Sequence, residues 1–177
     1  VVDNDEEKSA ENHFYEAIKD STLTAFYYVE PDRGICSARN CLLEKALLHE
    51  ASYIAFVDDD ELTHKQWLVN ILKVVEVYKS DIVGAPVIPT PETVAPTLYS
   101  KDPKHKSGSI PRNIPAGNVL FSKYLIDELG LRFDRYFDFI GCEDFDFFDR
   151  AIKQNMKSVW VDDAIIFETI PPERTTL

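Results

Sequence analysis

Four consecutive carboxylates, Asp58, Asp59, Asp60 and Glu61, form the strongest chemical signal in the sequence. They follow the apolar run SYIAFV at residues 52–57, which is typical of a buried parallel strand. Two like charges about 4 Å apart repel by up to about 4 kcal/mol at an effective dielectric near 20. A divalent cation removes that repulsion, and Mg²⁺ or Mn²⁺ prefers one or two carboxylates together with substrate phosphates. The cluster predicts a metal and phosphate site, with a solvated acidic turn as the alternative. Because side chains alternate along an extended chain, Asp58 and Asp60 are expected on one side and Asp59 on the other.

A second group of carboxylates lies in the segment GCEDFD at residues 141–146. The pattern predicts a helix that begins near Cys142 or Glu143, with acids in the first turn where the helix dipole favours them. A carboxylate among aromatic residues at a helix start can act as a general base. Capping of the helix by Asp144 is the alternative.

A third group lies in the segment RGICSARN at residues 33–40. Arg39 is expected early in a helix, near the end where anions bind. A surface salt bridge to one of the many acids is the alternative. The sequence contains neither GxGxxG nor GxxxxGK[ST], which argues against a dinucleotide oxidoreductase and a P-loop NTPase.

Strand and helix signals alternate along the chain, and this order predicts an α/β fold with a mostly parallel sheet flanked by helices. Thr63 is expected to cap the helix that contains Trp67. Ligands of such sheets bind beyond the carboxyl ends of the strands, where Asp3 and the carboxylates at 58–61 are expected. The expected strands are residues 1–3, 24–29, 52–57, 81–87, 117–122, 158–161 and 164–167, and the expected helices are 6–19, 37–50, 63–78, 124–129 and one from about 143.

Residues 86–115 contain 7 of the 10 prolines and are the most basic part of an acidic chain. Long loops in compact domains are usually functional or mobile. The segment is predicted to be a long flexible loop, which is either a solvated loop or a flap that meets an anionic ligand.

The composition limits the function classes. The chain has 177 residues, about the length of one domain, and a net charge of −12, which argues against a nucleic-acid-coating protein. Its three cysteines, an odd number without a CxxC pair, argue against a disulfide framework and a zinc site and favour a reducing compartment. No apolar run approaches the ~18 residues of a membrane span, and the opening VVDNDEEKSA is unlike a signal peptide. A cytoplasmic protein is expected.

Taken in order, six segments resemble the family 2 glycosyltransferases of bacterial type, which have the GT-A fold. The resemblance extends from Val2 to about Arg174, and the ordered set is far more specific than any one segment. The segments are VDN, RGICSARN, YIAFVDDDE, WL, PAGNVLF and GCEDFDFFDR.

The resemblance implies a role for each matched residue. Asp3 would hydrogen-bond the nucleotide base, and Arg39 would lie near the nucleotide or its diphosphate. Asp58 would face the ribose or sugar, with Asp59 beside it in the donor site, and Asp60 would bind the metal, Mn²⁺ or Mg²⁺. Within the Glu143–Asp144 pair, Asp144 would be the catalytic base. Asn118, with Gly117, would line the donor-sugar or acceptor side, and Glu168 stands where some relatives have a histidine.

The same resemblance implies inverting transfer of a sugar from a nucleotide-diphosphate sugar to a saccharide or lipid-linked acceptor. Such enzymes often build bacterial surface polysaccharides from the cytoplasmic side, so peripheral membrane association at that face is also implied. Residues 1–177 would form one partial catalytic domain, because the first strand and helix of the family would precede Val1.

Two other function classes remain open. A non-catalytic fragment that binds nucleotide sugars is favoured by the expected N-terminal truncation. A phosphohydrolase of the haloacid dehalogenase type is suggested by an apolar strand that ends in DDDE. Leu62 stands where that motif requires Thr or Val, which weakens the second alternative.

Overall fold

The computed structural model describes residues 1–90, 105–111 and 113–169. The chain divides into two compact units. The first is formed by Val1–Ala51 and Tyr124–Phe147, and the second by Ser52–Lys123 and Phe148–Leu177. The expectation of one partial domain over residues 1–177 stays a prediction.

The first unit contains a short parallel strand pair, helix α2 and four other helical segments. Strand β1 pairs with β2 in parallel, with Asp3 opposite Val29. Helix α2 begins two residues before the expected helix, and α1 is shorter than expected at both ends. The elements of this unit are β1 (Val2–Asp3), α1 (Glu11–Ile18), β2 (Tyr28–Val29), α2 (Ile35–Leu47), α4 (Tyr124–Asp127), the 3₁₀ helix η1 (Arg135–Phe137) and the first turn of α5 (Glu143–Lys153).

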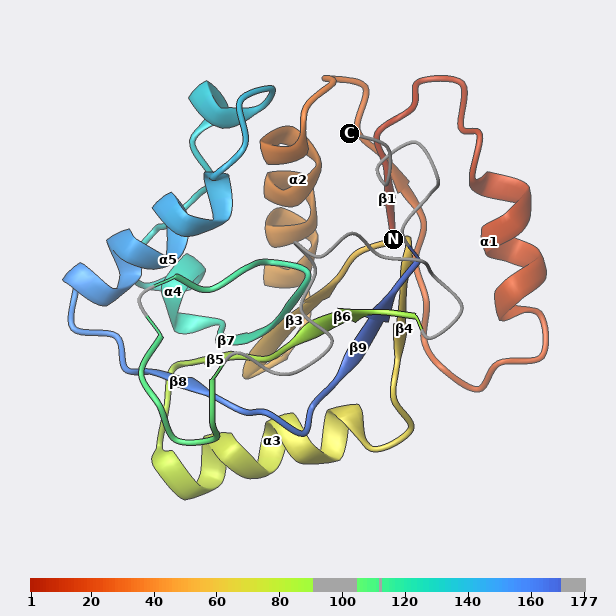
Figure 1. The fold of residues 1–177 in the computed structure, drawn as a ribbon. Coiled ribbons are helices and arrows are strands. Elements are labelled where there is room, and N and C mark those ends of the chain that lie inside the picture. The colour runs from red at the N-terminus through yellow and green to blue at the C-terminus, as the bar shows by residue number, and fades with distance from the viewer. Residues whose placement is uncertain (91–104, 112, 170–177) are drawn as a thin grey trace, which may run out of the picture. The chain divides into compact units, whose positions relative to one another are not determined.

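The second unit contains two small sheets and helix α3 (Figure 1). One sheet has the strand order β3-β7-β5-β8, and the other has the order β4-β9-β6. Its elements are β3 (Tyr53–Val57), β4 (Glu61–Thr63), α3 (Trp67–Tyr78), β5 (Ile82–Gly84), β6 (Val87–Pro89), β7 (Asn118–Ser122), the later turns of α5, β8 (Ser158–Trp160) and β9 (Ile166–Glu168).

The α/β class is confirmed, whereas the strand directions are more mixed than expected. Strand β7 lies between β3 and β5 and runs antiparallel to both, while β5 and β8 are parallel. Strand β3, expected to be buried and parallel, is an edge strand of this sheet, and only its Phe56 is buried. Alternating strand and helix signals cannot reveal this arrangement, because the partner of β3 lies some sixty residues later in the sequence.

The expected start of α3 at Thr63 is wrong. Thr63 belongs to strand β4, where it pairs with Ile166, and α3 begins at Trp67. Pairing with the distant strand β9 holds this segment in an extended conformation. A capping pattern of neighbouring residues cannot reveal that pairing.

The proline-rich segment 86–115 is partly ordered by pairing. Residues 87–89 form β6, which is parallel to β9. Gly108 donates its N–H to the carbonyl of Trp160, and the N–H of Trp160 donates to Ser109. The rest of the predicted loop, residues 91–104 and 112, lies outside the described residues.

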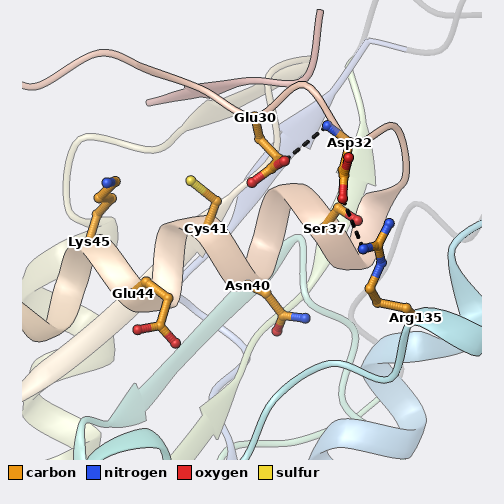
Figure 2. Close-up of a pocket in the computed structure, with 8 residues that line it drawn as sticks. All are labelled: Glu30, Asp32, Ser37, Asn40, Cys41, Glu44, Lys45 and Arg135. Atoms are coloured by element: carbon orange, nitrogen blue, oxygen red, sulfur yellow. Dashed lines mark hydrogen bonds and ion pairs between the residues drawn. The ribbon is translucent and has the colours of Figure 1, made fainter.

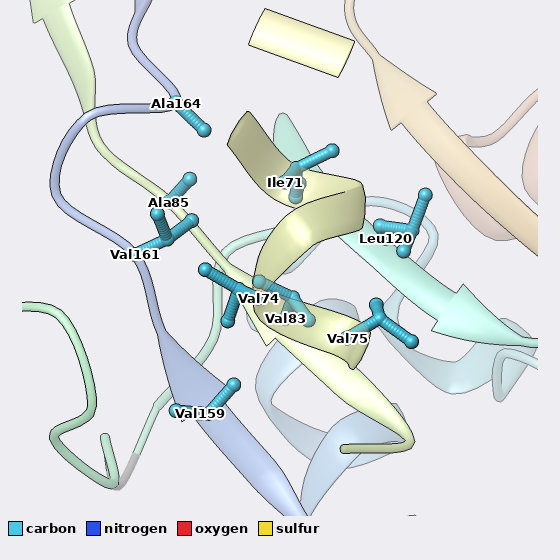
Figure 3. Packing of buried hydrophobic residues seen from close by; sticks show 9 residues of the cluster. All are labelled: Ile71, Val74, Val75, Val83, Ala85, Leu120, Val159, Val161 and Ala164. Carbon is cyan, nitrogen blue, oxygen red and sulfur yellow. The ribbon is translucent and has the colours of Figure 1, made fainter. Parts of the chain in front are cut away.

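Helix α3 covers one face of the four-stranded sheet through an aliphatic cluster (Figure 3). Ile71, Val74 and Val75 of the helix pack on side chains of β5, β7 and β8, and each residue in the cluster is at most 8% exposed. Burial of each such side chain stabilises the fold by about 1.5–3 kcal/mol. The sheet partners and neighbouring residues are Val83, Ala85, Leu120, Val159, Val161 and Ala164. Within the described ranges, no helix combines the length and apolar character that a membrane crossing requires.

Candidate functional site

Asp3, at the end of β1, is buried and held by three donors. The hydroxyl of Tyr27 and the N–H groups of Ala10 and Asp5 all donate to its carboxylate. These hydrogen bonds, that from Tyr27 first, lower the pKa of Asp3 and outweigh the effect of burial. A carboxylate has about four acceptor positions, so Asp3 is an ionised group with room for one further donor.

The first turn of α2 is capped by a residue about one hundred positions away. Gly34 precedes the helix and has no side chain to cap it. Instead, Asp138 accepts hydrogen bonds from the N–H groups of Cys36 (2.9 Å) and Ser37 (3.2 Å). Burial would raise the pKa of Asp138, but the bonds from Ser37 and Arg135 hold it below its usual value. The segment around Asp138 is thereby tied to α2.

Gly34 is required for this cap. Its φ is +141°, and a Cβ built on it would lie 2.2 Å from the Asp138 carboxylate. We predict that Gly34→Ala lowers the free energy of unfolding by about 1–3 kcal/mol through backbone strain and by roughly 1 kcal/mol more through the lost cap. Urea unfolding would measure the change.

Gly130→Ala is the matched control for that measurement. Gly130 also has a positive φ of +62°, but nothing lies within 4 Å of a Cβ built there. It therefore carries the strain without the collision. Equal destabilisation of the two variants would contradict the role given to Asp138.

Arg39 and Glu143 form a buried ion pair within the first unit. Their side chains are 9% and 10% exposed, and the guanidinium also lies over the ring of Phe133, 5.6 Å from its centroid. Asp144, the next residue, is half-buried in the first turn of α5, and its carboxylate accepts the N–H of Phe145. The pair fixes the backbone immediately before Asp144.

In the second unit, the acidic cluster forms a turn instead of the expected strand extension. The N–H of Glu61 bonds back to the carbonyl of Asp58 at 3.3 Å, and residues 59–60 form the turn. The alternation predicted for Asp58, Asp59 and Asp60 therefore has no strand to support it. Asp59 is nonetheless the most exposed of the three, while Asp58 and Asp60 are half-buried.

The side chain of Glu61 bonds back to the start of this turn. Its carboxylate accepts the N–H of Asp58 at 2.7 Å and lies against Gly117, where a built Cβ would be only 2.5 Å away. Burial raises the pKa of Glu61 to about 8, with a further contribution from the charges of Asp58, Asp60 and Glu168. The turn therefore brings the carboxylates of Asp58 and Asp60 close to that of Glu61.

We predict that Glu61 makes stability depend on pH. Between its unfolded pKa of about 4.5 and its folded pKa of about 8, the folded state holds a proton that the unfolded state has released. Stability therefore falls as pH rises through this range, in buffer without divalent cations. Glu61→Gln should flatten this slope, as measured by urea unfolding at a series of pH values. Glu76→Gln, on the exposed face of α3, is the control, and an unchanged slope in Glu61→Gln would contradict the assignment.

Asn118 at the start of β7 is fully buried and fully hydrogen-bonded. Its amide nitrogen donates to the carbonyls of Pro86 and Ala164, and its amide oxygen accepts the indole N–H of Trp67, all at 2.8 Å. The side chain thus ties together three segments around the carboxyl end of β5. Its predicted contact with the donor or acceptor stays a prediction.

The side chains of the acidic turn are of a type that can bind Mg²⁺ or Mn²⁺. These side chains offer hard carboxylate oxygens, the donor type that these cations prefer. In the described part of the chain, no three His, Cys, Asp or Glu side chains are grouped closely enough to hold a metal ion alone. A Mg²⁺ or Mn²⁺ ion held by one or two of these carboxylates would take its other ligands from a phosphate substrate and water.

A pocket of about 360 Å³ lies along α2 in the first unit, and none of the predicted site residues lines it (Figure 2). Its residues on α2 follow helical spacing, and Asp32 and Arg135 form an ion pair at one end, with N and O 3.0 Å apart. The lining residues are Glu30, Asp32, Ser37, Asn40, Cys41, Glu44, Lys45 and Arg135.

Sequence reasoning overlooked Tyr27 and Asp138, and it named Glu61 without a role. Asp138 gave no local signal, because the helix was expected to begin at Ser37, a residue type that commonly caps helices. No local signal pointed to Tyr27 as the partner of Asp3.

Comparison with known proteins gives consistent results. The family model "Glycosyl transferase family 2" matches residues 1–133. The chain is 29% identical to the succinoglycan biosynthesis protein ExoM of Rhizobium meliloti over 184 aligned positions, covering 100% of this chain and 58% of that protein. The solved structure of S. aureus TarS 1-349 in complex with UDP superposes with a TM-score of 0.71 at 17% identity, over 98% of this chain and 51% of that one. The complex of TarS 1-349 with UDP-GlcNAc gives 0.67 at 15% identity, over 97% and 49%. The chain thus spans about half the length of these proteins, and the structural likeness supports a shared fold.

Proposed function

This chain belongs to glycosyl transferase family 2, and from that premise we propose that it transfers a sugar from a nucleotide-diphosphate sugar to an acceptor hydroxyl, with inversion at the anomeric carbon. The curated relative is named for succinoglycan biosynthesis, which supports a role in the synthesis of a surface polysaccharide or glycolipid. We place the enzyme on the cytoplasmic side, in peripheral contact with the membrane.

The acidic turn at residues 58–61 is the single observation that carries the proposal. The turn brings four consecutive carboxylates together directly after β3, and a divalent cation there would offset their mutual repulsion and attract a diphosphate. Asp60 would hold Mn²⁺ or Mg²⁺, which would stabilise the charge that develops on the departing diphosphate. Asp58 and Asp59 would contact the ribose or sugar of the donor.

The first unit would supply the nucleotide contacts. The ionised carboxylate of Asp3 has one acceptor position left for an N–H of the base. The chain is also similar to structures that contain UDP and UDP-GlcNAc, so uridine diphosphate sugars are the first donors to test. Arg39 would lie toward the diphosphate. Asn118 would contribute indirectly, because its hydrogen bonds would hold the strand ends that carry the donor contacts.

Asp144 would be the general base. Its carboxylate takes the proton of the acceptor hydroxyl while the hydroxyl oxygen bonds to the anomeric carbon and the bond to the diphosphate oxygen breaks. Attack opposite the leaving group inverts the anomeric centre. Glu143, although adjacent, is bound to Arg39, so it would assist by orienting Asp144.

Calorimetry with a nucleotide sugar tests the metal assignment. We predict that Asp60→Ala removes the Mn²⁺-dependent part of donor binding, because this carboxylate would hold the metal. Glu76→Ala, an exposed acid on α3, should bind donor like the wild type. An unchanged response to Mn²⁺ in Asp60→Ala would overturn the role of Asp60, and donor binding without sugar transfer by the wild type would identify a non-catalytic binding protein.

A further inference from the structure

The segment before Asp144 carries a group of exposed apolar side chains. Phe139 is 83% exposed, Tyr136 72% and Ile140 65%. Large apolar side chains gathered on a surface usually mark a place where something binds. These three residues, Tyr136, Phe139 and Ile140, are called the apolar loop below.

The apolar loop is exposed but firmly anchored. Asp138, in its middle, is 6% exposed at its side chain and caps α2. Arg135, just before it, pairs with Asp32, and Glu143, just after it, pairs with Arg39. The loop therefore presents its aromatic rings on a fixed backbone, which reduces the entropy lost when a ligand binds.

The pocket on α2 adjoins this loop through Arg135, which lines the pocket and precedes Tyr136 (Figure 2). Its lining includes three carboxylates and an amide, those of Glu30, Asp32, Glu44 and Asn40, beside the cationic side chains of Lys45 and Arg135. The pocket also includes Ser37, which is 6% exposed and whose hydroxyl has no hydrogen-bond partner among the described residues. Each carboxylate already has one partner, since Glu44 pairs with Arg132, Asp32 with Arg135, and Glu30 accepts the N–H of Asp32. A carboxylate has about four acceptor positions, so each can still accept a hydrogen bond from a ligand hydroxyl group. A volume of about 360 Å³ is sufficient for a small ligand.

The charge of this surface distinguishes between anionic and uncharged ligands. Within the first unit, residues 132–147 and the pocket lining together carry eight carboxylates against three cationic side chains, those of Arg132, Arg135 and Lys45. This surface repels anionic lipid headgroups and acidic polymers. Aromatic rings beside carboxylates suit an uncharged sugar chain, whose C–H faces pack on the rings while its hydroxyl groups donate to the carboxylates.

We infer that the apolar loop and the pocket on α2 together bind the acceptor, and that this acceptor is an uncharged oligosaccharide. The inference rests on the proposed function for the identity of the ligand as acceptor. It adds the substrate class and a binding surface that extends beyond the reacting hydroxyl. Phe139 and Tyr136 are its ring contacts, and Glu44 is a hydroxyl acceptor in the pocket.

Binding of the full chain to a glycan array of neutral and acidic bacterial oligosaccharides tests the inference. We expect neutral oligosaccharides to bind and acidic ones to bind much less. Phe139→Ala and Tyr136→Ala should each weaken this binding about tenfold, as expected for loss of one aromatic contact. Glu44→Gln should weaken it as well. Leu23→Ala, which removes another exposed apolar side chain (79% exposed) of the first unit, should leave it unchanged.

Three further results would overturn the inference. They are the absence of binding to any neutral glycan, flotation with vesicles of phosphatidylglycerol that Phe139→Ala abolishes, and self-association that the same variant abolishes. Hydrolysis of UDP-GlcNAc without acceptor is measured in parallel, and Phe139→Ala should leave it unchanged. Donor binding and hydrolysis that are absent while glycans still bind would refute the proposed function and leave the glycan surface in place.

Discussion

Replacing Asp144 with asparagine is expected to lower kcat by about 10²–10⁴-fold, the usual contribution of a general base. Asparagine keeps the size of the side chain and its ability to accept the N–H of Phe145, but it cannot take a proton from the acceptor. Donor affinity should therefore change by no more than a few fold. Initial rates with saturating donor, together with calorimetry of donor binding, give the two numbers.

Asp149→Asn is the matched control for this measurement. Asp149 lies on the same helix, but it is half exposed and pairs with Lys153 one turn further on. Its replacement should leave kcat unchanged. If Asp144→Asn loses donor affinity in proportion to its rate, Asp144 binds the donor and another group is the base.

Breaking the Arg39–Glu143 pair should have the largest effect on stability. Arg39→Met leaves the carboxylate of Glu143 buried without its partner, which costs about 3–5 kcal/mol. The double variant Arg39→Met/Glu143→Leu removes both charges and keeps the volume, and the methionine still packs on Phe133. We expect it to recover most of the lost stability, as measured by urea unfolding.

The double variant also separates two roles of Arg39. The nucleotide contact implied by the family predicts that donor affinity stays low although stability returns. Unchanged affinity would show that Arg39 serves only as the partner of Glu143. If the free energy of unfolding of Arg39→Met lies within about 1 kcal/mol of the wild-type value, the buried pair is not important for stability.

Local patterns were sufficient to predict the elements that carry most of the candidate residues. Arg39 was expected early in a helix, and Glu143 and Asp144 were expected at the start of one, and α2 and α5 have them there. These predictions succeed because helical spacing and acids in a first turn are properties of neighbouring residues.

The contacts that organise those residues could not be predicted in the same way. Arg39 and Glu143 lie 104 positions apart, and the amide of Asn118 joins three separate segments. The same limit explains the error at Thr63, whose strand exists only because β9 pairs with it. Partners this distant follow from the topology, and the sheet is more mixed than an alternating pattern implies.

The cap on α2 has a consequence for the order of folding. The N–H groups of Cys36 and Ser37 are bound by the carboxylate of Asp138, which is synthesised 102 and 101 residues later. At ~5–20 residues per second, this is an interval of roughly 5–20 s on the ribosome. The helix that carries Arg39 therefore emerges with an open first turn and is completed late. A variant that damages only the cap should consequently hasten unfolding more than it slows folding.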